Sequence, residues 1–185
     1  IDESNLDNLV FLDNGTQFVI TSEKSGYMHL YLYDLNGRER QAITKGNFDI
    51  IDFYGYDPVR KLFYYSSYEE SPLEKYIYSI NEKGLKKKLT PVKGWNEASF
   101  SKNFNYYINV VSNTDTPPVT ALYNAKGKQV RVLEDNKAVK EAVKAYNLAK
   151  PEFIQIPAAD GKTMLNAWIM KPVNQETCLL YTSPS

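Results

Sequence analysis

The chain has 185 residues, and its 22 lysines and arginines are balanced by 22 aspartates and glutamates. This balance leaves no net field that would favour nucleic acid or an anionic membrane surface as a partner. The only cysteine is Cys178, so no disulfide can form within the chain, and no apolar run is long enough to span a bilayer.

A period of 45 residues runs through most of the chain. Three serines and three tyrosines recur at this spacing: Ser22, Ser67 and Ser112, and Tyr33, Tyr78 and Tyr123. Each serine ends a β-rich run, and each tyrosine ends a second such run eleven residues later. A repeat of about 40–50 residues with several short strands is typical of one blade of a β-propeller, a four-stranded sheet that packs against its neighbours.

The first copy of the repeat predicts four antiparallel strands in chain order. Asp13-Asn14-Gly15 and Asn36-Gly37 supply tight turns because Asn and Gly tolerate positive φ, and Ser25-Gly26 separates the two middle strands. The outermost strand carries charged residues, as edge strands often do. The four predicted strands are 9–12, 18–21, 29–35 and 38–44.

The second and third copies, at 54–90 and 99–133, keep this plan with altered loops, and Thr90 repeats Thr44. We therefore expect 1–135 to be all-β, with three four-stranded antiparallel propeller blades in an open arc. Three copies are too few to close a ring, so we expect an arc cut from a larger propeller. If register follows the period, equivalent strand positions are held by Phe18, Phe63 and Ile108, and by Tyr33, Tyr78 and Tyr123.

After the third copy, the pattern changes from strand to helix. Ala, Val and Tyr recur near helical spacing over 137–148, with Lys and Glu between them. Asp135-Asn136 can cap the start of this helix, and Pro151 ends it. The sequence therefore predicts a short linker helix within 136–150.

A non-repeating hairpin follows the helix. Its two strand signals are at 153–156 and 164–170, and Asp160-Gly161-Lys162 forms the turn between them. A propeller alone would return to another 45-residue blade at this point. We therefore expect 151–174 to be the first hairpin of a second domain.

The tail at 175–185 fits neither pattern. Its last eight residues, 178–185, match the translation of a transposase adaptor used in sequencing libraries. We interpret these eight residues as an artefact and leave them out of the fold prediction; a genuine polar tail is the alternative. On the artefact interpretation, Leu179 and Leu180 have no dedicated pocket.

Several short motifs carry a family resemblance. In chain order they are Gly26 to Tyr31, Ile43 to Ile50, Val132 to Asn136, and Phe153-Ile154 followed by Asp160-Gly161. Their order and spacing resemble the dipeptidyl peptidase IV family of serine peptidases, which is of the prolyl oligopeptidase type. The likeness covers 1–174 and implies the last three blades of an eight-bladed propeller, followed by the first hairpin of an α/β-hydrolase domain.

The resemblance implies an exopeptidase that removes N-terminal dipeptides with Pro or Ala in second position. Such enzymes use a Ser-Asp-His triad and an oxyanion-binding tyrosine, and a pair of glutamates holds the substrate amine. The triad and tyrosine are expected after Thr177, and the glutamates before Ile1. No serine here is flanked by the two glycines of a nucleophile elbow. We assign no catalytic, cofactor-binding or metal residue to the chain.

Four features could still carry chemistry, and for each a structural role is the favoured interpretation. Glu69-Glu70 resembles an amine-binding pair but falls in the loop after a repeated strand, so we expect a solvated loop. His29, the only histidine, is expected to form a hydrogen bond across its blade. Lys86-Lys87-Lys88 is expected to protect a sheet edge, and Trp95 and Trp168 are expected to pack.

The sequence thus predicts a piece of a serine dipeptidyl peptidase that forms propeller wall and interdomain junction and is inactive and poorly soluble alone. Its partners would be the rest of the propeller, the hydrolase domain and, through the whole enzyme, peptide substrates, in a bacterial periplasm or cell envelope. A non-catalytic envelope propeller that binds proteins or peptides is the main alternative. A carbohydrate-active propeller enzyme is a third, but it would need an inward-facing carboxylate pair that the sequence does not identify.

Overall fold

The computed structural model describes residues 8–12, 15–146 and 148–171. The chain forms two compact units, of which unit 1 comprises Ile1–Asn113 and Pro118–Asp135, and unit 2 comprises Thr114–Pro117 and Asn136–Ser185. The predicted tail and the first two residues of the Asp13-Asn14-Gly15 turn lie outside the described residues.

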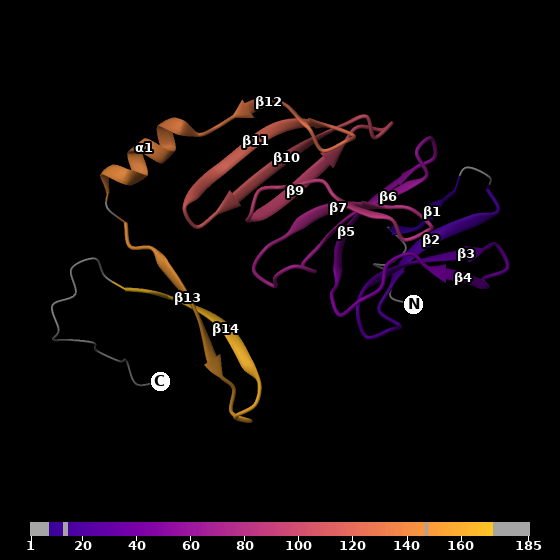
Figure 1. The fold of residues 1–185 in the computed structure, drawn as a ribbon, viewed down its shortest axis with the longest axis horizontal. Helices are drawn as coiled ribbons and strands as arrows, with labels where there is room; N and C mark the ends of the chain where they lie inside the picture. The colour runs from indigo at the N-terminus through magenta and orange to yellow at the C-terminus, as the bar shows by residue number, and fades with distance from the viewer. Residues whose placement is uncertain (1–7, 13–14, 147, 172–185) are drawn as a thin grey trace. The chain divides into compact units, whose positions relative to one another are not determined.

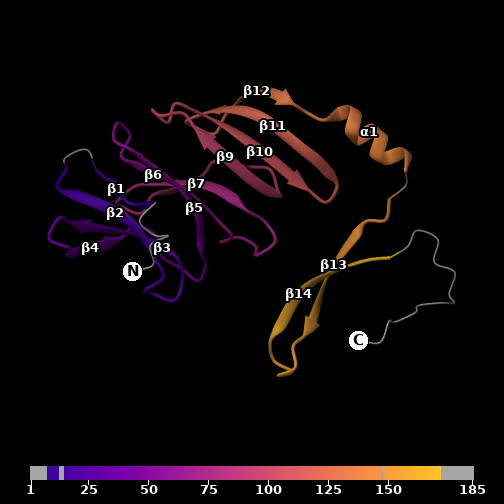
Figure 2. The ribbon, with the colours of Figure 1, turned by 180° about the vertical axis from the view of Figure 1, so that it is seen from behind.

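Unit 1 contains three four-stranded sheets that follow one another along the chain (Figure 1), and the same succession is seen from behind (Figure 2). The first sheet comprises β1 (Val10–Phe11), β2 (Gln17–Ser22), β3 (His29–Asp34) and β4 (Glu39–Ala42). The second comprises β5 (Ile50–Asp57), β6 (Leu62–Ser67), β7 (Tyr76–Ile80) and β8 (Lys86–Lys88). The third comprises β9 (Trp95–Phe100), β10 (Tyr106–Asn113), β11 (Thr116–Asn124) and β12 (Gln129–Glu134). Strands pair in chain order in every sheet, which confirms the prediction of three four-stranded antiparallel sheets.

The turn between the third and fourth strands has the same hydrogen bonds in each sheet. A side-chain oxygen of Asp34, Asn81 or Asn124 accepts from the backbone N–H groups two and four residues later, at 2.9–3.1 Å. The residue three positions on is a glycine with φ between 76° and 80°, a region that only glycine enters freely. These turn residues are 47 and then 43 positions apart, so the true structural period varies between copies.

The predicted equivalence of Tyr33, Tyr78 and Tyr123 is therefore wrong for Tyr78. Tyr33 and Tyr123 lie one residue before the Asp or Asn that forms the recurring turn, whereas Tyr78 lies three before it, at the position that Tyr31 has in the first sheet. The cause is a longer connection between the two middle strands. It spans 68–75 in the second sheet but only 23–28 in the first, and this shifts the third strand by two residues.

The predicted place of Ile108 is also wrong, by one residue. Phe18 pairs with Phe11 and Phe63 with Tyr56, and the matching pair in the third sheet joins Tyr107 to Phe100. Because side chains alternate between the faces of a strand, the one-residue difference places Ile108 on the opposite face. Tyr107 is accordingly buried, whereas Ile108 is 39% exposed.

The connection that leaves each of the first two sheets is repeated as predicted. The hydroxyl oxygen of Thr44 accepts from the backbone N–H of Leu30, and that of Thr90 accepts from Ile77, both at 3.0 Å. Both threonines are buried. A side chain thus continues the ladder where the outer strand ends, which confirms that Thr90 mirrors Thr44.

The second sheet is packed on both faces. Along β6, Phe63 and Tyr65 belong to a core cluster shared with the first sheet, and Tyr64 between them belongs to a cluster shared with the third. Ile77 on β7 likewise joins the second cluster, and its neighbours join the first. Burial of large side chains on two faces, at about 1.5–3 kcal/mol each, explains why these strands lack the usual apolar–polar alternation.

The helix of unit 2, α1 (Lys137–Ala145), ends earlier than the predicted 137–148. Asn136 occupies the N-cap position, but its backbone is left-handed and no side-chain capping hydrogen bond is present. A capping residue normally has an extended backbone, so Asn136 does not cap the helix through its side chain. All residues of the helix are exposed.

The hairpin of unit 2 pairs β13 (Pro151–Pro157) with β14 (Met164–Met170), close to the predicted strands. Asp160 forms its turn by accepting from the backbone N–H groups of Lys162 and Thr163 at 2.9 Å and from the Thr163 hydroxyl at 2.6 Å. These hydrogen bonds, with those from Thr163 the strongest, lower the pKa of Asp160 to about 2. Most side chains of the hairpin are exposed.

Candidate functional site

A polar cluster lies where the second and third sheets of unit 1 meet, and we call it the Lys75 cluster. It comprises Asp52, Tyr54, Ser66, Tyr68, Lys75, Trp95 and Glu97. Its frame is a short parallel bridge between Lys75 and Trp95. The backbone N–H of Lys75 donates to Gly94 O, and that of Asn96 donates to Lys75 O, both at 3.1 Å. Main-chain hydrogen bonds therefore fix Lys75 against the start of β9.

The ammonium group of Lys75 is buried between two carboxylates. Its Nζ lies 3.1 Å from Asp52 Oδ2 and 3.6 Å from Glu97 Oε1. It also lies 4.9 Å from the centroid of the Trp95 ring, a cation–π contact. A buried ammonium is costly unless it is paired. The two carboxylates and the Trp95 ring offset this cost for Lys75.

Asp52 receives three hydrogen bonds on one oxygen. Its Oδ2 accepts from Ser66 Oγ at 2.7 Å, Lys75 Nζ at 3.1 Å and Tyr54 Oη at 3.3 Å. Burial acts to raise the pKa of Asp52, but the hydrogen bonds from Ser66 and Lys75 and the charge of Lys75 outweigh it and hold that pKa below its ordinary value. Asp52 is therefore a fixed negative charge at neutral pH.

Trp95 and Glu97 form the more open side of the cluster. The indole N–H of Trp95 donates to Glu97 Oε1 at 3.0 Å, and the Trp95 ring packs against Tyr68 with centroids 5.7 Å apart. Trp95 is nevertheless 41% exposed. The cluster thus offers an aromatic surface beside two carboxylates and one buried ammonium, and the lowered pKa of Asp52 makes its carboxylate a weak base toward Ser66.

His29 has the structural role that the sequence predicts. Its ring is buried, with Nε2 3.0 Å from the carbonyl of Gly46 and Nδ1 3.1 Å from the hydroxyl of Thr44. Since a carbonyl only accepts, Nε2 donates, and the Thr44 hydroxyl donates to Nδ1. Both ring nitrogens bond to the connection that follows β4, which confirms the hydrogen-bonded strand histidine.

The expectation of a solvated loop at Glu69-Glu70 holds for Glu70, whose side chain is 46% exposed, but is wrong for Glu69. Glu69 forms an ion pair with Lys86, and its side chain is only 8% exposed. Glu70 forms an ion pair with Lys88 at 2.7 Å and accepts from the Tyr78 hydroxyl at 2.9 Å. For Glu69 the expectation fails because Lys86 of β8 reaches across to the loop and pairs with its carboxylate. The same pairing identifies Lys86-Lys87-Lys88 as an outer strand rather than an open anion patch.

Trp168 lies on β14 of unit 2 and is 64% exposed. Its strand partner is Phe153 on β13, also exposed. Within the described residues of unit 2, the expected packing role of Trp168 is thus limited to the hairpin itself. It is far more exposed than Trp95, for which packing contacts with Tyr68 and Lys75 are present.

The sequence did not single out Asp52, Lys75 or Glu97. The available signal was a charged residue inside or next to an aromatic strand run, as Asp52 is in β5 and Lys75 is before β7. Sequence alone could not join them, because they lie in three separate segments of the chain: β5, the residue before β7, and β9. Among the described residues, no group of three or more His, Cys, Asp or Glu side chains could hold a metal ion.

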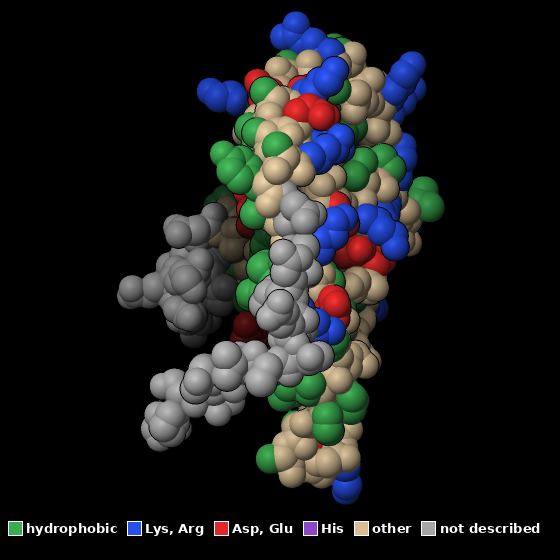
Figure 3. All heavy atoms as spheres, turned by 90° about the vertical axis from the view of Figure 1, so that its left-hand side faces the viewer, with side chains coloured by type: hydrophobic (Ala, Val, Ile, Leu, Met, Phe, Trp, Pro, Cys, Tyr) green, Lys and Arg blue, Asp and Glu red, His purple; other side chains and the backbone are tan. Residues whose placement is uncertain are grey.

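Lys and Arg side chains are interspersed with Asp and Glu on the face shown in Figure 3. This matches the balanced composition of the chain. In the part of the chain that the structure describes, no helix has the length and apolar character needed to cross a membrane.

Three successive four-stranded meanders with buried faces between them define unit 1 as an arc of β-propeller blades. The family model that describes the N-terminal region of dipeptidyl peptidase IV matches residues 3–118. The chain belongs to the dipeptidyl peptidase IV family.

Individual relatives agree with this family. The crystal structure of Porphyromonas gingivalis dipeptidyl peptidase 4 is similar over 95% of this chain and 25% of its own, with 41% identity and a TM-score of 0.87. A probable dipeptidyl peptidase 4 of Aspergillus flavus is 30% identical over 157 residues, which are 82% of this chain and 20% of that protein. The dipeptidyl peptidase 4 of Trichophyton rubrum is 30% identical over 86% of this chain and 22% of its own length. The chain thus spans a fifth to a quarter of these relatives.

Proposed function

We propose that this chain is the propeller-wall and junction part of a serine dipeptidyl peptidase that removes N-terminal X-Pro or X-Ala dipeptides. The observation that carries the proposal is the 41% identity and TM-score of 0.87 to Porphyromonas gingivalis dipeptidyl peptidase 4 over 95% of the chain. In this assignment the chain holds no catalytic residue. The triad, the oxyanion tyrosine and the amine-binding glutamates belong to other parts of the enzyme.

The three sheets would serve as a rigid wall. β5 and β9 are the strands by which the chain enters the second and third sheets, and in a propeller these strands line the central channel. Asp52 on β5 and the Trp95–Glu97 pair on β9 then contribute charge and aromatic surface to that channel. Such a wall limits access to short or unfolded peptide ends and excludes folded proteins.

Residues 136–150 would link the propeller to the hydrolase domain, and 151–174 would be its first hairpin. The exposed apolar residues of the hairpin support this role, because a sheet with apolar faces is normally covered by further structure. A pure binding propeller gives no reason for such a hairpin. By analogy with its relatives, the enzyme would act on peptides in a bacterial periplasm or cell envelope, without a cofactor.

The proposal is tested by two preparations assayed side by side: the 185-residue chain, and the longer protein encoded by an independently assembled copy of its gene. The longer protein is expected to hydrolyse a Gly-Pro chromogenic substrate and to lose this activity with a serine-directed inhibitor. The chain alone is expected to be inactive. Inhibitor-sensitive hydrolysis by the chain alone would contradict the assignment, and an inactive longer protein that binds peptides would favour a non-catalytic envelope propeller.

A further inference from the structure

The strand order gives the sheets of unit 1 two distinct ends. Strands pair antiparallel in chain order, so the first–second and third–fourth connections of each sheet lie at one end, which we call the turn end. The second–third connections and the links between sheets lie at the other end. The chain also leaves unit 1 there, after β12, so we call it the exit end.

The zero net charge of the chain hides a separation of charge between these two ends. Five connections of the turn end are described throughout: 35–38, 58–61, 81–85, 101–105 and 125–128. They carry seven basic residues and one acidic residue, namely Arg38, Arg60, Lys61, Lys83, Lys102, Lys126, Lys128 and Glu82. At the exit end, the connections 23–28, 43–49, 68–75 and 89–94 carry Lys24, Lys45, Lys75 and Lys93 against Glu23, Asp49, Glu69, Glu70 and Glu74. The turn end is therefore the basic one.

The positive charges of the turn end are exposed and mostly uncompensated. All seven basic residues are exposed. Within the described part of the chain, only Arg60 among them forms an ion pair, with Asp57 at 2.6 Å. At the exit end, by contrast, Lys24 pairs with Glu39, and Lys75 lies between the carboxylates of the Lys75 cluster. Unpaired like charges at one end of unit 1 create a positive potential there.

Contacts between the second and third sheets join these charges into one surface. The side chain of Arg60 donates to the side-chain oxygen of Asn105, and Lys87 Nζ donates to the backbone carbonyl of Lys126 at 2.7 Å. An open cavity of about 310 Å³ lies beside these contacts, and its lining includes Arg60 and Lys126 but no acidic side chain. Anionic groups can therefore approach the turn end without meeting a carboxylate at this cavity.

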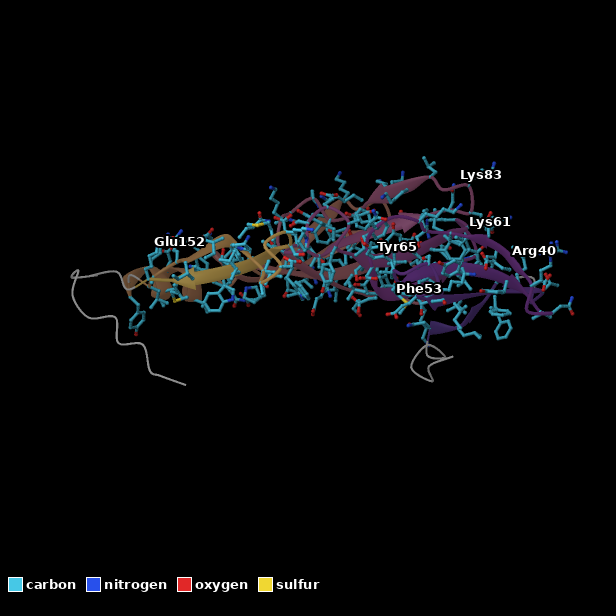
Figure 4. All side chains as sticks on the ribbon, turned by 90° about the horizontal axis from the view of Figure 1, so that it is seen from below. Arg40, Phe53, Lys61, Tyr65, Lys83 and Glu152 are labelled. Carbon is cyan, nitrogen blue, oxygen red and sulfur yellow. The ribbon has the colours of Figure 1, made fainter. Side chains whose placement is uncertain are left out.

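The turn end also exposes aliphatic side chains between its cations. Leu35, Val59 and Leu85 are 58%, 86% and 73% exposed, and each lies within three residues of a basic residue. In Figure 4, Lys61 and Lys83, which lie two residues from Val59 and Leu85, are at the same margin of unit 1. Exposed aliphatic side chains flanked by Lys and Arg are typical of surfaces that bind the interface of an anionic membrane. A soluble polyanion would use the cations but not the aliphatic side chains.

We propose that the turn end of unit 1 docks on an anionic membrane surface. Its lysines and arginines pair with lipid phosphates, and Leu35, Val59 and Leu85 enter the interfacial layer of the bilayer. Such peripheral docking needs no membrane-spanning helix. The proposal is separate from the proposed peptidase function and does not depend on it.

The test measures binding of the 185-residue chain to lipid vesicles by flotation in a density gradient, where vesicle-bound protein rises and aggregated protein sinks. The vesicles contain either phosphatidylcholine alone or an equal mixture of phosphatidylcholine and phosphatidylglycerol. We expect binding to the anionic vesicles to be at least about tenfold tighter, since each lysine near an anionic surface contributes roughly a fivefold gain. Raising the salt from about 0.1 M to about 1 M shortens the screening length from roughly 10 Å to roughly 3 Å and should remove most of this difference.

Charge variants locate the surface. Lys83 and Lys126 each lie two residues after the Asn that forms their turn, and only their backbone N–H groups bond to it. The double variant Lys83→Gln, Lys126→Gln should weaken binding to the anionic vesicles by about 20-fold. Lys45→Gln with Lys93→Gln is the matched control, because it removes two exposed lysines from the exit end, and it should change binding less than about twofold.

Aliphatic variants distinguish a bilayer from other anionic partners. Val59→Ser should weaken binding to the anionic vesicles about fivefold without changing its salt dependence, because it removes apolar surface that the bilayer would cover. Val92→Ser, at an exposed position of the exit end, is the control and should leave binding unchanged. Heparin, a soluble polyanion, should compete only weakly for the unaltered chain.

Four results would overturn the proposal. One is the absence of flotation with anionic vesicles when circular dichroism shows folded β structure. Another is equal binding to both kinds of vesicle, which would mean that open sheet faces bind lipid. A third is an equal loss of binding in the two double lysine variants. The last is full competition by heparin together with an unchanged Val59→Ser variant, which would identify the turn end as a site for soluble polyanions.

Discussion

The second sheet of unit 1 and the β13–β14 hairpin of unit 2 are made of similar residues but bury them to opposite extents. Every residue of β7 is buried, whereas all residues of β14 except Ala167 are exposed. Both segments are rich in aromatic and aliphatic residues, so local preference for strand structure is satisfied in each. They differ in what packs on their faces, because the first and third sheets cover the second sheet on both sides.

This difference shows that strand formation and strand burial have separate causes. The hairpin forms from its own turn and its seven cross-strand pairs, although no other described element of unit 2 covers its faces. The second sheet gains its stability from side chains contributed by its neighbours. An uncovered hairpin with Phe153, Trp168 and Met170 exposed is the kind of surface that a further domain normally covers.

The largest expected effect comes from truncating the same residue type in both regions. Phe63→Ala should lower the free energy of unfolding of the chain by about 3–5 kcal/mol, because Phe63 is fully buried between two sheets. Phe153→Ala should change it by less than about 0.5 kcal/mol, because Phe153 is 52% exposed. Urea unfolding followed by circular dichroism measures both.

The same pair of variants sharpens the comparison in the longer enzyme. If a hydrolase domain covers the hairpin there, Phe153→Ala should become costly, at several kcal/mol. A neutral Phe153→Ala in both proteins would show that the hairpin stays uncovered, and would count against its assignment to a second domain.

A somewhat smaller effect is expected at the contact between the second and third sheets. Asn96 is fully buried, and its side-chain amide donates to the carbonyls of Lys75, Val92 and Gly94 at 2.9–3.3 Å. Asn96→Ala should destabilise unit 1 by about 2 kcal/mol, because it removes these hydrogen bonds and leaves the buried amide of Asn109, which donates to Asn96 Oδ1 at 2.9 Å, without its acceptor. Asn47→Ala, at an exposed position, is the control. Equal thermal midpoints for both variants would show that the two sheets do not depend on this amide.

A smaller effect again separates two tyrosines in the same core cluster. The hydroxyl of Tyr107 donates to the carbonyl of Leu89 at 3.1 Å, whereas the hydroxyl of Tyr64 has no partner. Tyr107→Phe should cost about 1 kcal/mol, and Tyr64→Phe should be neutral or stabilising, because it removes an unsatisfied buried group. Thermal unfolding of both variants tests the expected order, and the opposite order would mean that the Tyr64 hydroxyl is satisfied by water.

The repeat made the three sheets predictable because turn chemistry and strand patterning are local. The Asn-Gly turns and the threonines at the sheet connections were visible in the sequence, and the structure uses them. Register was less predictable. The 45-residue spacing of the tyrosines gave no sign of the longer connection at 68–75, which shifts β7 by two residues relative to β3. A residue that recurs at a fixed spacing does not reveal the length of the loop before it.

The Lys75 cluster could not be predicted from the sequence, for a different reason. Its charged members lie at Asp52, Lys75 and Glu97, each unremarkable in its own segment of sequence. They meet because β5 and β9 lie in adjacent sheets, and because the bridge between Lys75 and Trp95 ties the two sheets together. Side-chain chemistry gave the types of residue to look for, but only the packing of one sheet on the next shows which of them touch.

The smallest expected effect concerns pH, at a cluster that is neither fully buried nor fully exposed. The pKa of Asp52 is lower in the folded chain than its ordinary value, so the folded state binds fewer protons than the unfolded state at acidic pH. The stabilisation from Asp52 is therefore complete above about pH 4, the unfolded pKa, and is lost as the pH falls through the lower folded pKa.

Asp52→Asn should remove this part of the acid dependence and reduce stability at pH 7 by less than about 1 kcal/mol, since the carboxylate is partly exposed and screened. Unfolding free energies measured from pH 3 to pH 7 should thus converge for the two proteins at the acidic end. Curves that stay parallel over the whole range would show that Lys75 and Ser66 do not hold the Asp52 carboxylate in its charged form.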